Sequence, residues 1–205
     1  MPDTNQLQNL TEDDPGEFRW LNDPVAVEFS EGTMSVTAPE KSDFFINPEN
    51  NEVSASAPLF YREVEGDFVV TALVKPDFRD KWNAAAIMVH IDENNWIKFA
   101  FENSDATGKS IVTVVTRGVS DDANGVRLEA FDKVWLRLAR KGNNFAMHWS
   151  SDGKTYVMAR LAQISGARRV KVGLEAQSPV GQAVTHEFLY FNIEEKTVRD
   201  LRAGY

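Results

Sequence analysis

A chain of 205 residues with 42% hydrophobic and 26% charged residues has the composition of one globular domain, because all-β sandwiches often use about 200–250 residues as a single unit. Its formal net charge of −9 would repel polyanions, so we expect no nucleic-acid partner and no anionic membrane surface as a partner. The chain has no cysteine, which excludes disulfides, thiolate catalysis and zinc–sulfur sites.

The first segment, residues 1–16, is polar and acidic, and we expect a loosely attached tail. It has neither the basic nor the apolar region of a secretion signal. No apolar run in the chain approaches the roughly 20 residues of a membrane-spanning helix. We therefore expect a cytoplasmic protein with a single domain over residues 17–194, followed at residues 195–205 by a tail or a short helix.

From residue 17 onward the hydrophobic pattern repeats every two residues, as is typical of half-buried β-strands. Polar stretches such as residues 63–67 (EVEGD), 104–109 (SDATGK) and 150–155 (SSDGKT) indicate turns between the strands. In chain order, we predict strands at residues 26–30, 33–38, 43–47, 67–75, 84–92, 95–103, 109–117, 134–141, 144–150, 156–162, 169–177 and 184–195.

About a dozen short strands joined by hairpin turns leave few architectures. Long helical periodicity is missing, and no repeat of 40–50 residues indicates a propeller. The pattern predicts an all-β fold, a two-sheet antiparallel jelly-roll sandwich in which each sheet buries one face.

Four stretches carry a resemblance to a known family: residues 84–102 (AAAIMVHIDENNWIKFAFE), 114–121 (VVTRGVSD), 135–156 (WLRLARKGNNFAMHWSSDGKTY) and 170–179 (VKVGLEAQSP). They resemble a family of domains of unknown function named after a yeast regulation-of-enolase protein. The resemblance runs in order from about Asp43 to Ile193. It implies a concanavalin A-like fold, in which the concave sheet usually carries any ligand site, and it implies no established reaction. The family's polar, glycine-bearing stretch before the methionine strand is replaced here by residues 83–86 (NAAA).

One strand, residues 95–103, has an unusual second face. Alternation places Ile97, Phe99 and Phe101 in the core, and leaves an indole, an ammonium and a carboxylate on the other face. The same alternation on neighbouring strands predicts a shared ligand-binding face. With its edges, this face contains Trp82, Met88, His90, Trp96, Lys98, Glu102, Arg117, Glu175 and Gln177.

The assignment of Arg117 depends on the strand at residues 109–117. If Val112 and Val114 are core residues, alternation places Thr113, Val115 and Arg117 on the shared face.

The chemistry of the shared face favours a carbohydrate or another small polar ligand. Indole faces cover the apolar C–H surface of a sugar ring, and fixed charged groups make directional hydrogen bonds to hydroxyls. The alternative is a structural network, in which Lys98 or Arg117 pairs with Glu102 or Glu175 to reduce the cost of burial, while Trp96 covers a lysine stem.

A catalytic role would require two carboxyl groups at a suitable separation. Glucanases of the concanavalin A-like superfamily commonly carry both carboxyl groups on one strand. The nearest stretch here, residues 90–95 (HIDENN), lacks that pattern. Glu102 and Glu175 could form a pair across strands, which gives a glycoside-processing enzyme as an alternative. A protein-interaction domain without a small-molecule ligand is the third.

The sequence gives little indication of a metal site. His90, His148 and His186 are single histidines on separate predicted strands. The acidic stretch Ser120–Gly125 is interpreted as a loop that is either solvated or binds calcium. We predict no metal and no cofactor, and a non-catalytic binding or regulatory domain with a carbohydrate or a protein as its partner.

Overall fold

In the computed structural model, which describes residues 4–205, the chain forms sixteen strands and no helix. The first sheet contains, in spatial order, β1 (Arg19–Leu21), β6 (Leu59–Glu65), β15 (Arg169–Gln177), β8 (Ala84–Asp92), β9 (Asn95–Ser104), β10 (Gly108–Arg117) and β11 (Val119–Arg127). The second contains β14 (Val157–Gln163), β13 (Asn144–Ser150), β12 (Val134–Lys141), β7 (Phe68–Lys75), β16 (Val184–Glu194), β3 (Thr33–Ala38) and β2 (Ala26–Ser30). A separate hairpin pairs β4 (Phe44–Ile46) with β5 (Val53–Ala55).

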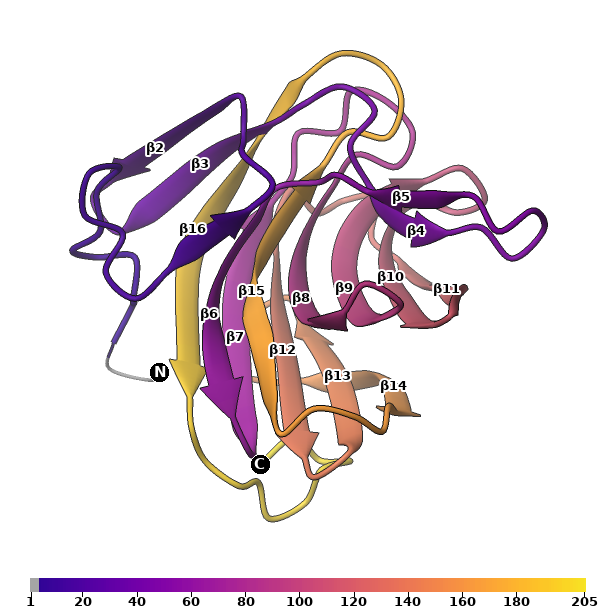
Figure 1. Cartoon of the computed structure of the whole chain (residues 1–205). Coiled ribbons are helices and arrows are strands. Elements are labelled where there is room, and N and C mark those ends of the chain that lie inside the picture. The colour runs from indigo at the N-terminus through magenta and orange to yellow at the C-terminus, as the bar shows by residue number, and fades with distance from the viewer. Residues whose placement is uncertain (1–3) are drawn as a thin grey trace.

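The two large sheets stack face to face and enclose one hydrophobic core (Figure 1). Alternate residues of each strand point into it, among them Phe99 and Phe101 of β9, Leu136 and Leu138 of β12, and Phe188 of β16. Neighbouring strands in both sheets are antiparallel. The predicted all-β, two-sheet antiparallel sandwich is confirmed.

Strand β6 lies where the sequence analysis expected no strand and placed a turn at residues 63–67. Phe60 and Val64 point into the core, and Glu63 and Glu65 at the end of the strand are exposed. Arg169 on β15 forms an ion pair with Glu65, its register partner, at 3.3 Å. The polar residues at 63–67 predicted a turn, but Glu65 lies in a strand and pairs with a charged residue of the neighbouring strand.

The acidic stretch Ser120–Gly125 is also strand, not loop, since it lies within β11 at the end of the first sheet. Alternation sends Asp121 and Asp122 to opposite faces of the sheet, and Asp121 pairs with Arg160 at 2.8 Å. Charged residues are common on edge strands because they discourage pairing with another chain. The calcium-loop interpretation is therefore not supported by the backbone that residues 120–125 adopt.

The described part of the predicted N-terminal tail is held against the sandwich. Leu7 is buried in the core, and the backbone N–H of Gln6 donates to the carbonyl of Phe191 at 2.8 Å. The Asn5 side-chain oxygen accepts from the N–H of Phe191 at 3.1 Å. These amide groups satisfy the part of β16 that lies beyond its pairing with β3. Residues 1–3 of the predicted tail lie outside the described residues.

The C-terminal segment, residues 195–205, covers part of the outer face of the second sheet. Val198 packs against Val69 and Ala139, and the Lys141 ammonium donates to the carbonyls of residues 198 and 199. The segment ends in a turn rather than the short helix that was one of its two predicted forms. Within residues 4–205, no helix is long and apolar enough to cross a membrane.

The β4–β5 hairpin lies over the outer face of the first sheet, the face turned away from the second sheet. In Figure 1 it is seen beside β9, β10 and β11. The backbone N–H of Ile46 donates to the hydroxyl of Ser120 on β11 at 2.9 Å. The hairpin therefore divides the outer face into a covered part and an open part.

Candidate functional site

Strand register brings most of the predicted site residues onto the outer face of the first sheet. One row across the sheet joins Gly173, Met88, Lys98, Val114 and Asp122. Two residues further along the strands, the next row contains Glu175, Ala86, Ala100, Val112 and Asn124, and the row after that contains Gln177, Ala84, Glu102 and Ser110. Pairing of β15, β8 and β9 thus places Lys98, Glu102, Glu175 and Gln177 on one face.

The hairpin covers three of the predicted ligand-binding residues. Phe44 packs edge-on against Trp96, with ring centroids 5.7 Å apart, and against His90 at 5.9 Å. Met88 belongs to the same buried cluster. Met88, His90 and Trp96 are all buried, and none of them lines the adjacent cavity. They therefore pack beneath the hairpin and support the neighbouring cavity.

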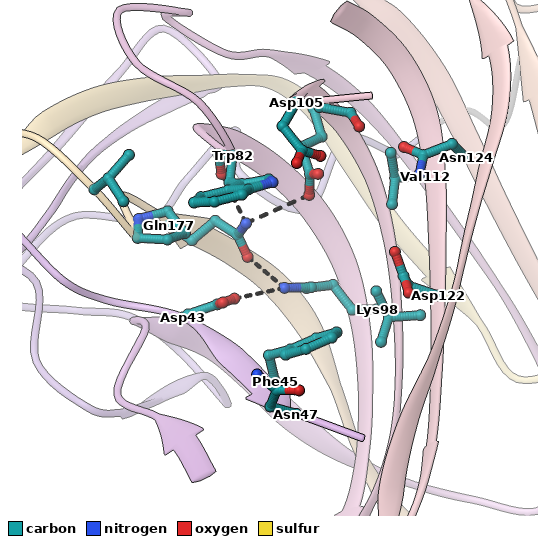
Figure 2. Close-up of a pocket in the computed structure, with 15 residues that line it drawn as sticks. Asp43, Phe45, Asn47, Trp82, Lys98, Asp105, Val112, Asp122, Asn124 and Gln177 are labelled. Carbon is teal, nitrogen blue, oxygen red and sulfur yellow. Dashed lines mark hydrogen bonds and ion pairs between the residues drawn. The ribbon is translucent and has the colours of Figure 1, made fainter. Parts of the chain in front are cut away.

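Beside the hairpin, the open part of the outer face contains a cavity of about 410 Å³ (Figure 2). Its size lies within the range of small-molecule sites. It is lined by Asp43, Phe45, Asn47, Trp82, Lys98, Glu102, Ser104, Asp105, Val112, Val114, Asp122, Asn124, Gln177, Pro179 and Val180. Four of these, Trp82, Lys98, Glu102 and Gln177, belong to the predicted set.

Small side chains lie in the sheet between the charged residues of the site. Ala84, Ala86 and Ala100 form a buried cluster on the outer face, and register places Ala84 between Gln177 and Glu102. Alanines leave room above the sheet that larger residues would fill. Ala84 and Ala86 therefore contribute shape rather than hydrogen-bonding groups to this face.

Lys98 is the centre of a buried polar network (Figure 2). Its side chain is 2% exposed, and its ammonium donates to Asp43 at 2.7 Å and to the side-chain oxygen of Gln177 at 2.5 Å. The Gln177 amide donates in turn to the carbonyl of Trp82 at 2.8 Å and to Glu102 at 3.5 Å. These bonds fix the positions of the lysine and glutamine side chains.

Three carboxyl groups surround this one ammonium. Burial by itself lowers the pKa of Lys98, but the charges of Asp43, Glu175 and Glu102 outweigh that effect and raise it. Burial raises the pKa of Glu102 to about 8 and that of Glu175 to about 8, although Lys98 acts in the opposite direction on both. Both glutamic acids therefore hold a proton at neutral pH far more readily than an ordinary glutamic acid.

Trp82 stands at the rim in a strained conformation. Its φ is 62°, in the left-handed region that a tryptophan rarely adopts. Two hydrogen bonds to its backbone hold it there, one from its N–H to the carbonyl of Asn103 at 2.7 Å and one from the Gln177 side-chain amide to its carbonyl. The residue remains 36% exposed. Backbone strain of this kind is often found at binding sites, because the surrounding structure must maintain it.

Arg117 does not belong to the site, which corrects the sequence prediction. Val115 of β10 points into the core, so Arg117 lies on the same side of the strand as the core residues. Val112 and Val114 are on the outer face and line the cavity. The face assignment of β10 was inverted because both faces of this strand are apolar and buried, so alternation alone could not distinguish them.

Several lining residues were missed because their contribution depends on tertiary contacts. Asp43, Phe45 and Asn47 come from the hairpin, and Pro179 and Val180 follow the end of β15. The sequence DFFIN does alternate, with Phe44 and Ile46 buried and the other positions less so. This alternation indicates a strand with one buried face, but it does not indicate which sheet the hairpin covers.

The histidines do not form a metal site. The backbone N–H of Asp77 donates to Nδ1 of His186, so Nε2 carries the proton and donates to the carbonyl of Gln177 at 3.0 Å. Burial lowers the pKa of His186 to about 4, which keeps the ring neutral. Within the described chain, no three His, Asp or Glu residues are arranged to hold a metal ion.

Sequence comparison matches the chain to one family model and to a yeast protein. A family model described as "Protein of unknown function (DUF1349)" matches residues 20–196. Regulation of enolase protein 1 of Saccharomyces cerevisiae is 29% identical over 160 residues, which cover 78% of this chain and 80% of the yeast protein. A crystal structure titled as a functionally unknown protein from Saccharomyces cerevisiae aligns with a TM-score of 0.83 and 26% identity, covering 90% of this chain and 99% of that one.

More distant solved structures share the fold. Lectin I-B4 from Griffonia simplicifolia aligns with a TM-score of 0.59 and 11% identity, covering 93% of this chain and 98% of the lectin. The carbohydrate binding module CBM66 from Bacillus subtilis aligns with a TM-score of 0.54 and 14% identity, covering 91% of this chain and 98% of the module. At these identities the alignments support the concanavalin A-like sandwich alone.

Proposed function

Because the chain belongs to the DUF1349 family, whose description assigns no reaction, we propose from its cavity that it is a non-catalytic carbohydrate-binding domain. The observation that carries this proposal is the joining of an exposed indole to a fixed polar network in one cavity. Trp82 offers a flat apolar surface at the rim, and Lys98 and Gln177 offer oriented polar groups below it. This combination suits a sugar ring, which is apolar on its C–H faces and polar at its edge.

The fold relatives support the same class of ligand. One of them is named a lectin and another a carbohydrate binding module. A glycoside-processing role for Glu102 and Glu175 is weaker, because Glu175 is fully buried and does not line the cavity. A substrate in the cavity would meet one of the two carboxyl groups that such a reaction requires.

A glycan array probed with the purified protein tests the proposal. We expect binding that Trp82→Ala reduces at least tenfold, since stacking on the indole is lost. Phe131→Ala is a matched control, because Phe131 is equally exposed, at 36%, and does not line the cavity. An array without retained glycans, or binding that Trp82→Ala leaves unchanged, would contradict the proposal.

A regulatory protein partner is the second candidate, and the name of the yeast relative favours it. Titration of the chain with purified enolase separates the two candidates. Binding of enolase by a protein that retains no glycan would establish the second over the first.

A further inference from the structure

The cavity contains an excess of negative side chains. Asp43, Glu102, Asp105 and Asp122 line it, whereas Lys98 is the one cationic side chain among the described lining residues. Lys98 already donates to Asp43 and to Gln177. Even when Glu102 is protonated, three carboxylates share this single ammonium.

Two of these carboxylates are uncompensated. Asp105 and Asp122 are exposed at the rim, and neither forms an ion pair with any residue between 4 and 205. The neighbouring Asp121 points to the opposite face and pairs with Arg160 at 2.8 Å. The same strand thus carries one neutralised aspartate away from the cavity and one unpaired aspartate facing it.

A further carboxyl group lies buried on the outer face, outside the lining of the cavity. Glu175 is fully buried on the face that forms the cavity, and neither of its oxygens has a hydrogen-bond partner among the described residues. Burial raises its pKa to about 8, so at about pH 6 it holds a proton and adds no negative charge. The uncompensated carboxylates at that pH are therefore the ones at the rim of the cavity.

The distribution of the carboxylates distinguishes between kinds of cation. Figure 2 shows Asp43, Asp105 and Asp122 on different sides of the cavity. No three acidic or histidine side chains of the described chain converge as metal ligands do. Diffuse negative charge around an aromatic wall, here Trp82 and Phe45, suits an organic ammonium group, which interacts with carboxylates and with the faces of aromatic rings.

This inference rests on the proposed carbohydrate site: we infer that its ligand is an amino sugar, with its ring on Trp82 and its protonated amine facing the rim carboxylates, Asp122 among them. The sugar supplies the apolar face that the indole requires. The amine supplies the positive charge that the cavity lacks. A neutral sugar would leave both rim carboxylates uncompensated.

Calorimetric titration with three trisaccharides of one β-1,4-linked backbone tests this inference. They differ at C2 alone, which carries an amine in chitosan triose, an acetamide in chitin triose and a hydroxyl in cellotriose. At about pH 6, an amine with the pKa of about 7.7–8.0 of an α-amino group is protonated. We expect the amine form to bind at least about tenfold more tightly, since one charge-assisted hydrogen bond is sufficient for that factor.

Two variants locate the effect. Asp122→Asn should reduce affinity for chitosan triose about tenfold and leave affinity for cellotriose unchanged, whereas Asp121→Asn, on the other face of β11, should change neither. Equal binding of the three sugars would overturn the inference and leave carbohydrate binding intact. Binding of none of them, combined with an empty glycan array, would overturn both. Tight binding of chitosan triose that Asp122→Asn does not weaken would also overturn the assigned position of the amine.

Discussion

At the scale of single residues, Lys98 joins the buried polar network to the cavity. Its ammonium is buried and donates hydrogen bonds to Asp43 and Gln177, so Lys98 has a structural role in the folded protein. Gln177 then holds the carbonyl of Trp82. Lys98 therefore forms the structural network that was one of the two sequence alternatives, and it also lines the cavity.

Lys98→Met should reduce the free energy of unfolding by about 3–5 kcal/mol at neutral pH, because it leaves a buried ion pair without one partner. Chemical denaturation of the variant and the parent measures the difference. Lys133→Met is the control, since Lys133 is exposed, and its change should remain within about 0.5 kcal/mol. A loss below about 1 kcal/mol for Lys98→Met would show that the network contributes little to stability.

Glu175→Gln should remove part of the loss of stability at alkaline pH. The pKa of Glu175 is raised to about 8 in the folded protein from an ordinary 4.5, so its contribution is complete below about 4.5 and is lost as the pH rises toward about 8. Between about pH 6.5 and 8, the parent should lose about 2 kcal/mol that the variant retains.

Denaturation curves at about pH 6.5 and about pH 8.5 provide this comparison. The histidines do not interfere, since the pKa values of His90 and His186 are lowered to about 4 and their effect lies between about 4 and 6.5. Parallel pH dependence in the parent and Glu175→Gln would contradict the assigned protonation of Glu175.

At the scale of elements, β9 and the β4–β5 hairpin define the site together. Strand β9 presents Phe99 to the core and Lys98 to the cavity, and the hairpin covers Trp96 with Phe44. The hairpin also brings Asp43 to the ammonium. One strand therefore provides the floor of the site, and an element more than forty residues earlier provides its wall.

Phe99→Ala should destabilise the protein by about 3–5 kcal/mol, because it empties a fully buried position between the sheets. Thermal or chemical unfolding measures it. Val157→Ala, at a position 52% exposed on β14, should change stability by no more than about 0.5 kcal/mol. A change below about 1 kcal/mol at Phe99 would be inconsistent with the described packing of β9.

At the scale of the whole molecule, the two ends of the described chain complete the sandwich. Leu7 enters the core, and the last eleven residues cover part of the second sheet. The His148 ring is bonded to the carbonyl of Arg202 at 2.8 Å. Both terminal segments therefore contribute to the stability of the domain.

Removal of residues 196–205 should lower the free energy of unfolding by about 2–4 kcal/mol, from the lost burial of Val198 and the lost bonds of Lys141. Differential scanning calorimetry of the shortened and full chains checks this. Tyr205→Ala, at a position 72% exposed, should leave the transition unchanged. An unchanged transition in the shortened chain would show that the segment is attached without stabilising the fold.

The sequence by itself determined the class of fold, twelve of the strands and the two faces of β8, β9 and β15. It could do so because a strand that buries one face must alternate, and Ile97, Phe99 and Phe101 alternate clearly with Lys98 and Glu102. The same rule failed on β10, where valines occupy both faces, and on β6, where charged residues resembled a turn.

Tertiary structure alone decided which polar residues face the cavity. Trp96 and Glu175 share a face with Lys98, yet the hairpin buries the first, and the second lies fully buried. The cavity wall comes from Asp43, Phe45 and Asp122, which are far apart in the chain. Alternation reports the side of a sheet on which a residue lies, whereas exposure depends on what packs over that side, and long-range packing of this kind leaves no local period in the sequence.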